Sequence, residues 1–148
     1  MKKTITTIFF ICLTLSAFSQ GKERREQIKA LKVAHITEAL SLTETEAQKF
    51  WPIYNAHEKE MHMLRRNAKE KRRGLEIENI TEAEAKQAIK DFLAFEKEQQ
   101  NLETDLIENL LTAIPAKKII LLHIAEEDFK RKLFEQYKKR RLQNKKNK

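Results

Sequence analysis

The sequence contains only one cysteine, two glycines and two prolines among its 148 residues. The cysteine, Cys12, lies inside an N-terminal apolar run, so removal of this run would leave no thiol for disulfides, thiolate catalysis or zinc–thiolate sites. The scarcity of glycine and proline argues against the tight turns that a many-stranded sheet requires. Glu, Lys, Arg, Gln, Ala and Leu dominate instead. This composition predicts long helices in one domain.

The N-terminus has the pattern of a secretory signal. Lys2 and Lys3 precede an apolar run from Ile8 to Leu15, and Ala17-Phe18-Ser19 then offers small residues where a signal peptidase cleaves. We therefore expect residues 1–19 to be a signal peptide, cleaved before Gln20. The run is shorter than the roughly 20 apolar residues that span a bilayer, although a retained N-terminal anchor is the alternative.

Apolar residues at spacings of three and four predict four helices. The first covers residues 22–40 and stops near Ser41; the last ends near Tyr137, before a basic tail at residues 138–148. The break between the third and the fourth helix falls at Thr112 to Pro115, because proline suits the first turn of a helix. The stripes that carry this prediction are Ile28, Leu31, His35 and Ala39; Ala88, Ile89, Phe92, Phe95, Leu102, Leu106, Leu110 and Ile114; and Ile119, Leu122, Ala125, Phe129, Leu133 and Tyr137.

The same sequence pattern marks the start of two of the helices. Thr43 is followed three positions later by Glu46, and Thr81 by Glu84, which is the pattern of a capping box. Gly74 lies between these two starts and predicts a helix end in the left-handed conformation.

These helices are too long for a compact bundle of this size. We therefore predict an all-α fold, a long antiparallel helical hairpin of about four helices. A homodimer is an economical way to cover the apolar stripe that such an open chain leaves exposed.

Pro52 falls near the ninth residue of the second helix, where it has no amide to donate to the carbonyl of Gln48. We expect a kink there. The alternative is that the helix begins at Pro52.

Phe50, Trp51 and Tyr54 lie on the apolar stripe of the second helix that continues to Met61. One interpretation is that they are core. The other is that they line a concave surface that binds apolar segments of a client or partner.

His57, Met61 and His62 suggest a metal site. His57 and Met61 share a helix face, whereas His62 points elsewhere. A site completed by His35 or His123 from another helix would suit copper or nickel. The competing interpretation is that no metal or cofactor is bound.

Basic residues gather in two segments. The first holds Arg65, Arg66, Arg72 and Arg73, and the second is the tail, where residues 130–148 contain ten basic side chains and one acid within a chain of net charge +8. They either pair with the acidic residues of neighbouring helices or attract acidic clients or, peripherally, anionic lipid. Export removes nucleic acid as a partner.

The sequence shows no nucleophile beside a base and no glycine-rich phosphate loop. We therefore expect the protein not to be an enzyme.

The chain resembles the Spy/CpxP-like periplasmic proteins, whose motif is two copies of Leu-Thr-x-x-Gln. Leu42, Thr43 and Glu46 form the first copy, with Glu in place of Gln, and Leu111 with Thr112 starts a second copy that has Ala or Lys near its final position. The segment from Glu46 to Tyr54 further resembles a Bacteroidetes-type branch described as sensors that accompany extracytoplasmic-function sigma factors. The resemblance covers about residues 28–141, with residues 20–137 as the helical domain.

This resemblance implies a cradle-shaped homodimer in the periplasm and two candidate functions. In one, the protein is a stress- or metal-responsive sensor that signals to a membrane anti-sigma factor. In the other, it is a holdase that binds unfolded envelope proteins without ATP. A structural role in the envelope is the third possibility.

Overall fold

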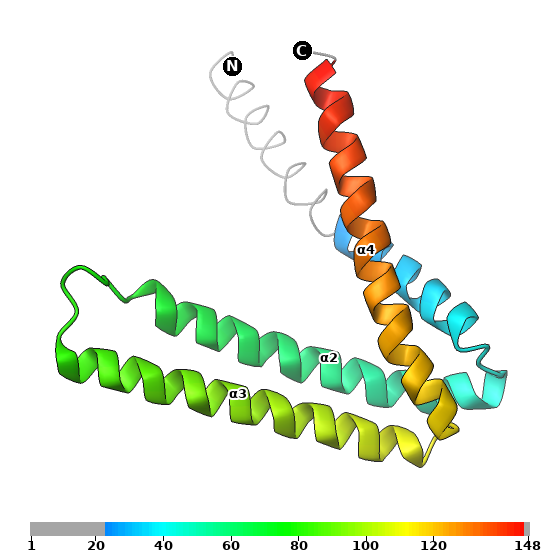
Figure 1. The fold of residues 1–148 in the computed structure, drawn as a ribbon. Helices are drawn as coiled ribbons and strands as arrows, with labels where there is room; N and C mark the ends of the chain where they lie inside the picture. The colour runs from blue at the N-terminus through cyan, green and yellow to red at the C-terminus, as the bar shows by residue number, and fades with distance from the viewer. Residues whose placement is uncertain (1–22, 147–148) are drawn as a thin grey trace, which may run out of the picture. The chain divides into compact units, whose positions relative to one another are not determined.

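The computed structural model describes residues 23–146, and this part of the chain is all-helical, with no strand (Figure 1). Residues 23–39 form the first helical segment, followed by α2 (Glu44–Arg73), α3 (Glu82–Leu111) and α4 (Ala116–Lys146). The prediction of an all-α fold with four helices is therefore confirmed. The expected signal peptide, residues 1–19, lies outside the described residues. No helix within residues 23–146 has the length and apolar character needed to cross a membrane.

The contacts divide the chain into two compact units. The hairpin unit is Leu42–Ile120, which holds α2, α3 and the start of α4. The terminal unit combines the segment that ends at Ser41 with the segment that begins at Leu121. The boundary between the units therefore falls inside α4.

Both predicted capping boxes are present in the hairpin unit, where α2 and α3 run antiparallel side by side (Figure 1). Thr43 Oγ1 accepts from the amide of Glu46 at 3.3 Å, and a Glu46 carboxylate oxygen accepts from the amide of Thr43 at 2.8 Å. The same two bonds join Thr81 and Glu84, at 3.3 and 2.9 Å. Each box satisfies amides that would otherwise have no partner at the helix start.

The predicted left-handed end of α2 is wrong. Gly74 has φ −84° and ψ −1°, which are right-handed values. The left-handed residue is Ser41 (φ 47°), at the end of the first helical segment. There the amide of Ser41 donates to the carbonyl of Glu38 at 3.0 Å. At Gly74 the chain leaves the helix through a right-handed turn that requires no glycine, since the amide of Leu75 reaches the carbonyl of Arg72 at 3.2 Å.

Pro52 lies inside α2, which begins at Glu44. The alternative in which the helix begins at Pro52 is therefore wrong. The capping box explains this result, because it fixes the first turn eight residues earlier in the chain.

The fourth helix does not end at Tyr137 but continues to Lys146. Residues 138–146 are therefore a helix and not an irregular tail. Lys, Arg, Gln and Leu are strong helix formers, and neither Gly nor Pro interrupts them here.

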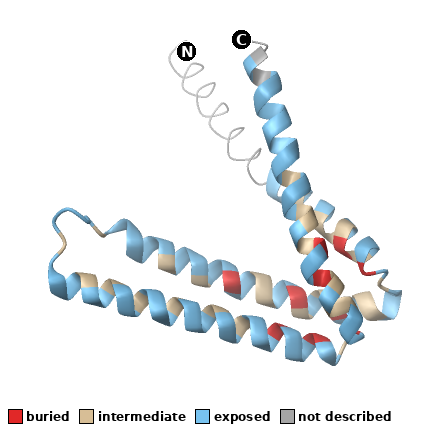
Figure 2. Ribbon diagram, in the orientation of Figure 1, coloured by how far each residue is buried: buried red, intermediate tan, exposed pale blue. Residues whose placement is uncertain are grey.

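The hairpin unit is packed at one end only. Its buried apolar side chains are Phe50, Tyr54, Met61, Leu106, Leu110 and Ile114. Between Met61 and Leu106, which includes the turn of the hairpin, no residue is buried (Figure 2). The terminal unit buries Ile36, Leu40, Leu122 and Ala125. We call the part between Met61 and Leu106 the free half of the hairpin. Its apolar side chains therefore remain at the surface.

Candidate functional site

The free half of the hairpin carries an apolar patch. Ile89, Phe92 and Leu93 on α3, and Ile77 in the turn, are each more than half exposed. Helical spacings of three and four place the α3 residues on adjoining faces. We call these four residues together with Lys71, Arg72 and Arg73 the tip surface. Large apolar side chains gathered at a surface mark interaction sites.

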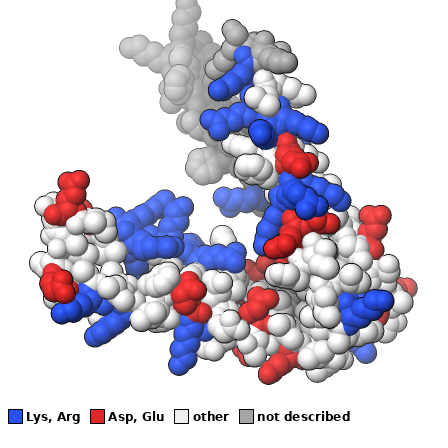
Figure 3. Space-filling view, viewed as in Figure 1, with Lys and Arg blue, Asp and Glu red and all other residues white. Residues whose placement is uncertain are grey.

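The basic end of α2 lies at the same end of the hairpin unit as this patch (Figure 1). Lys71 Nζ lies 3.3 Å from Asp91 Oδ1, which ties the basic end of α2 to α3 beside Phe92. A cleft of about 170 Å³ runs between the two helices here, lined by Lys71, Arg72, Leu75, Glu84, Gln87, Ala88 and Asp91. Figure 3 shows Lys and Arg gathered along the half of α2 that leads to the turn.

All four predicted arginines of α2 are exposed: Arg65, Arg66, Arg72 and Arg73. Two of them make local contacts. Arg66 Nε lies 3.8 Å from Glu70 Oε1, and Arg72 Nε donates to the carbonyl of Ala68 at 3.2 Å. Neither contact neutralises the cluster, because an exposed ion pair four residues apart contributes only about 0.3–0.5 kcal/mol.

Phe50 and Tyr54 are buried, at 0% and 2% exposure, so their assignment to an exposed client-binding surface is wrong. Their rings stack with centroids 5.3 Å apart, and Trp51 meets both rings edge-on. Trp51 is half-buried. The stripe that carries these residues faces the packed end of the hairpin unit, so they form its core.

The first motif copy contacts the start of α4, a few residues after the second copy. Lys118, six residues after Thr112, places its Nζ 2.6 Å from Glu46 Oε2, and both side chains are about four-fifths covered. Thr112 caps the end of α3, where its hydroxyl donates to the carbonyl of Asn109 at 2.7 Å. Leu42 is half-buried, whereas Leu111 is exposed. These residues connect helix ends and give no sign of binding a ligand.

The hydrogen bond from Lys118 and those from Thr43 hold the pKa of Glu46 below its ordinary value. The Thr81 hydroxyl and amide lower the pKa of Glu84 in the same way. Both carboxylates are thus favoured in the charged form that caps a helix.

The candidate metal ligands of α2 differ in their surroundings. His57 Nδ1 lies 3.2 Å from the carbonyl oxygen of Leu102, and its Nε2 lies 3.8 Å from Glu103. Met61 is buried, whereas His62 is exposed. Within residues 23–146, no group of three or more His, Cys, Asp or Glu side chains could hold a metal ion. His35 contacts Phe129 in the terminal unit, and His123 is exposed there.

Ile89 and Phe92 belong to the apolar stripe that predicted α3, and both are exposed. Leu93 could have indicated this exposure from the sequence, because Leu93 and Phe92 together make the apolar face of α3 wider than one stripe. The ion pair of Lys118 with Glu46 could not be predicted from the sequence, because it depends on how the helices of the hairpin unit pack.

No known protein family, curated protein or solved structure matches this chain.

Proposed function

We propose that the protein is a non-enzymatic, ATP-independent periplasmic holdase that binds unfolded polypeptides at the tip surface. The observation that supports this function is the exposure of Ile77, Ile89, Phe92 and Leu93, at the same end of the hairpin unit as the basic end of α2. Unfolded chains present apolar segments, and an apolar patch that is not buried within the fold binds them.

The charge of the tip surface supports the same function. Lys71, Arg72 and Arg73 lie in the last turn of α2, at the same end of the hairpin unit as the apolar patch, and attract clients with acidic segments. Attraction between exposed charges is screened over about 8 Å at physiological ionic strength. We therefore expect salt to weaken the capture of acidic clients more than that of neutral clients.

The test is suppression of aggregation of an unfolded client by the double variant Phe92→Ser with Leu93→Ser. We expect suppression to be lost while helix content stays unchanged, because these side chains are exposed. Ile120→Ser and Leu142→Ser, which are also more than half exposed, are the controls and should keep activity. Equal suppression by the double variant and the controls would refute the tip surface as the client site.

A regulatory sensor associated with an extracytoplasmic-function sigma factor is the second candidate. It is supported by the segment Glu46–Tyr54, which resembles that group of proteins and supplies the buried residues Phe50 and Tyr54 of α2. In this function the tip surface docks a membrane anti-sigma factor. Deletion of the gene should then change transcription of the sigma factor's targets, and the Phe92→Ser, Leu93→Ser chain should fail to restore it. A purely structural envelope protein would change neither transcription nor client aggregation.

We further propose that the protein is a homodimer joined through the other end of α3, where Ile107 and Leu111 are exposed. An isologous interface would bury this pair against a second copy. Analytical ultracentrifugation should give twice the mass of one chain, and Ile107→Lys should give a single chain. A concentration-independent monomer in the unmodified protein would exclude this interface.

We also propose that α2 bends at Pro52. Proline has no amide hydrogen to donate, so the carbonyl of Gln48 lacks its helical partner. A crystal structure with α2 straight through Pro52 would contradict it.

A further inference from the structure

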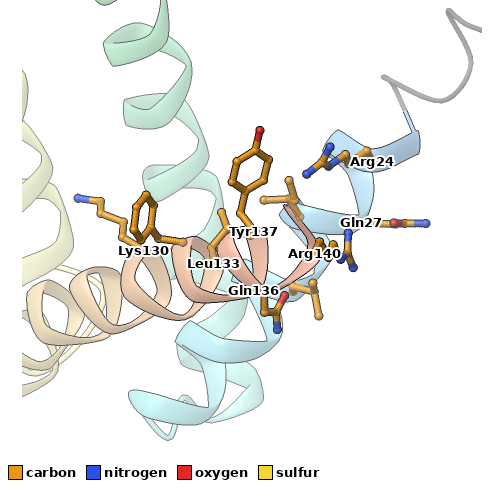
Figure 4. A pocket seen from close by; sticks show the side chains of 10 residues that line it. Arg24, Gln27, Lys130, Leu133, Gln136, Tyr137 and Arg140 are labelled. Carbon is orange, nitrogen blue, oxygen red and sulfur yellow. The ribbon is translucent and has the colours of Figure 1, made fainter. Parts of the chain in front are cut away.

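The terminal unit contains a groove that the proposed function does not use. It lies between the helical residues 23–39 and the C-terminal half of α4, and its volume is about 540 Å³ (Figure 4). This volume falls within the range of about 300–1,000 Å³ that is typical of small-molecule sites. The lining residues are Arg24, Gln27, Ile28, Leu31, Lys130, Leu133, Phe134, Gln136, Tyr137 and Arg140.

Half of these residues form an apolar floor. Ile28 and Leu133 are half-buried, whereas Leu31, Phe134 and Tyr137 are each more than half exposed. The groove therefore offers apolar side chains from both helical segments, and three of these side chains are largely exposed. Filling it with an apolar chain would remove this surface from water, which is favourable by about 25 cal/mol per Å².

The charged residues of the groove all have the same sign. Arg24, Lys130 and Arg140 are basic, and none of the residues within 23–146 that line the groove is acidic. Figure 4 shows Tyr137 between Lys130 on one side and Arg24 and Arg140 on the other. The guanidinium carbon of Arg24 lies 5.8 Å from the centre of the Tyr137 ring, which holds this cation beside the apolar floor. Two guanidinium groups at one end suit a carboxylate, which arginine binds through paired hydrogen bonds.

We propose that this groove binds an anionic single-chain amphiphile of the fatty-acid class. The carboxylate lies at the Arg24 and Arg140 end, and the alkyl chain lies along Leu133, Phe134 and Leu31. Charge complementarity and the size of the groove together favour this ligand. A folded partner would require a far larger contact, with a total buried area of about 1,200–2,000 Å².

The experiment uses the purified protein, with a fluorescent polyene fatty acid as the probe and dodecanoate as a competitor below its micelle concentration. Dodecyltrimethylammonium, which has the same chain length and a cationic head, tests the charge requirement. We expect dodecanoate to displace the probe and the cation not to displace it. Displacement by both with equal strength would show non-specific apolar binding and overturn the proposal.

The variant Arg24→Gln with Arg140→Gln should weaken binding of the probe about tenfold or more, because the carboxylate loses both guanidinium partners. The matched control is Arg65→Gln with Arg66→Gln on α2, which should bind as the unmodified protein does. Phe134→Gln, a single exposed change, should also weaken binding. Circular dichroism confirms that each variant keeps its helix content. Binding that none of the groove variants weakens would place the ligand elsewhere and overturn the proposal.

Two further probes distinguish a fatty acid from two other ligands of the groove, a membrane surface and a polypeptide. Vesicles rich in phosphatidylglycerol bound through the groove arginines, without binding of the free fatty acid, would identify a membrane surface instead. An extended acidic peptide bound in their place would identify a polypeptide. Either result overturns the proposal. The holdase proposal is independent of this outcome, since the Phe92→Ser, Leu93→Ser variant leaves the groove intact and should bind the fatty acid normally.

Discussion

The Glu46 carboxylate has two roles at once. It closes the capping box of α2 by accepting from the amide of Thr43, and it pairs with Lys118 at 2.6 Å. The first role was readable from the sequence, because the partners are three residues apart. The second was not, since Lys118 lies 72 positions away and their approach depends on the tertiary packing of the hairpin unit.

Glu46 makes stability dependent on pH. Because the pKa of Glu46 is lower in the folded state than its ordinary value of 4.5, the unfolded state binds a proton first as the pH falls. Its contribution is therefore present above about pH 4.5 and is lost as the pH falls through the lower, folded pKa. We expect Glu46→Gln, which keeps a capping acceptor, to be less stable than the unmodified protein at neutral pH. This difference should disappear in acid.

Denaturant unfolding at several pH values measures this effect. The control is a double-mutant cycle with Lys118→Met, which isolates the interaction of the two side chains. The interaction free energy should fade as Glu46 is protonated. An interaction that stays unchanged at a pH low enough to protonate Glu46 would show that the charge of Glu46 does not contribute.

Gly74→Ala tests the right-handed end of α2. The backbone there suits any L-residue, and an added Cβ would only touch the carbonyl oxygen of Lys71 at 3.9 Å. We expect alanine to stabilise the protein by about 0.4–1 kcal/mol, chiefly by restricting the unfolded chain. Thermal unfolding measures this change. A loss of about 1–2 kcal/mol would instead indicate a left-handed residue, as we expected from the sequence.

At the scale of elements, the helix starts were predicted well and the helix ends less well. Thr43 and Thr81 carry their capping partners within four residues, so the local sequence determines both starts. The end of α4 was predicted too early because a run of like charges was interpreted as an irregular tail, although its residues are good helix formers. The apolar face of α3 was predicted from its periodicity, but periodicity does not show whether another helix covers that face.

Thr81→Ala should remove the start signal of α3. Its hydroxyl accepts from the amide of Glu84 and donates to the Glu84 carboxylate at 2.7 Å. We expect a loss of about 1 kcal/mol and faster hydrogen exchange of the amides in the first turn of α3. Thr104→Ala in the middle of the same helix is the control, and it should be neutral or slightly stabilising because alanine is the better helix former. Equal effects of the two changes would mean that the cap does not matter.

At the scale of the whole molecule, stability depends on few side chains. The structure buries ten apolar residues within its described part, and none between Met61 and Leu106. The long helices are therefore stabilised mainly at one end of the hairpin unit and within the terminal unit. A chain of this kind retains a surface for binding at the cost of a small core.

Phe50→Ala and Phe92→Ala separate core from surface across the whole molecule. Phe50 is fully buried and stacks on Tyr54, so its truncation leaves a cavity and should cost about 3–5 kcal/mol. Phe92 is more than half exposed, and its truncation should change stability by no more than about 0.5 kcal/mol. Urea unfolding followed by circular dichroism measures both. If Phe92→Ala proved as destabilising as Phe50→Ala, the apolar face of α3 would be covered in solution, and the tip surface would already be occupied by another part of the protein or by a second copy.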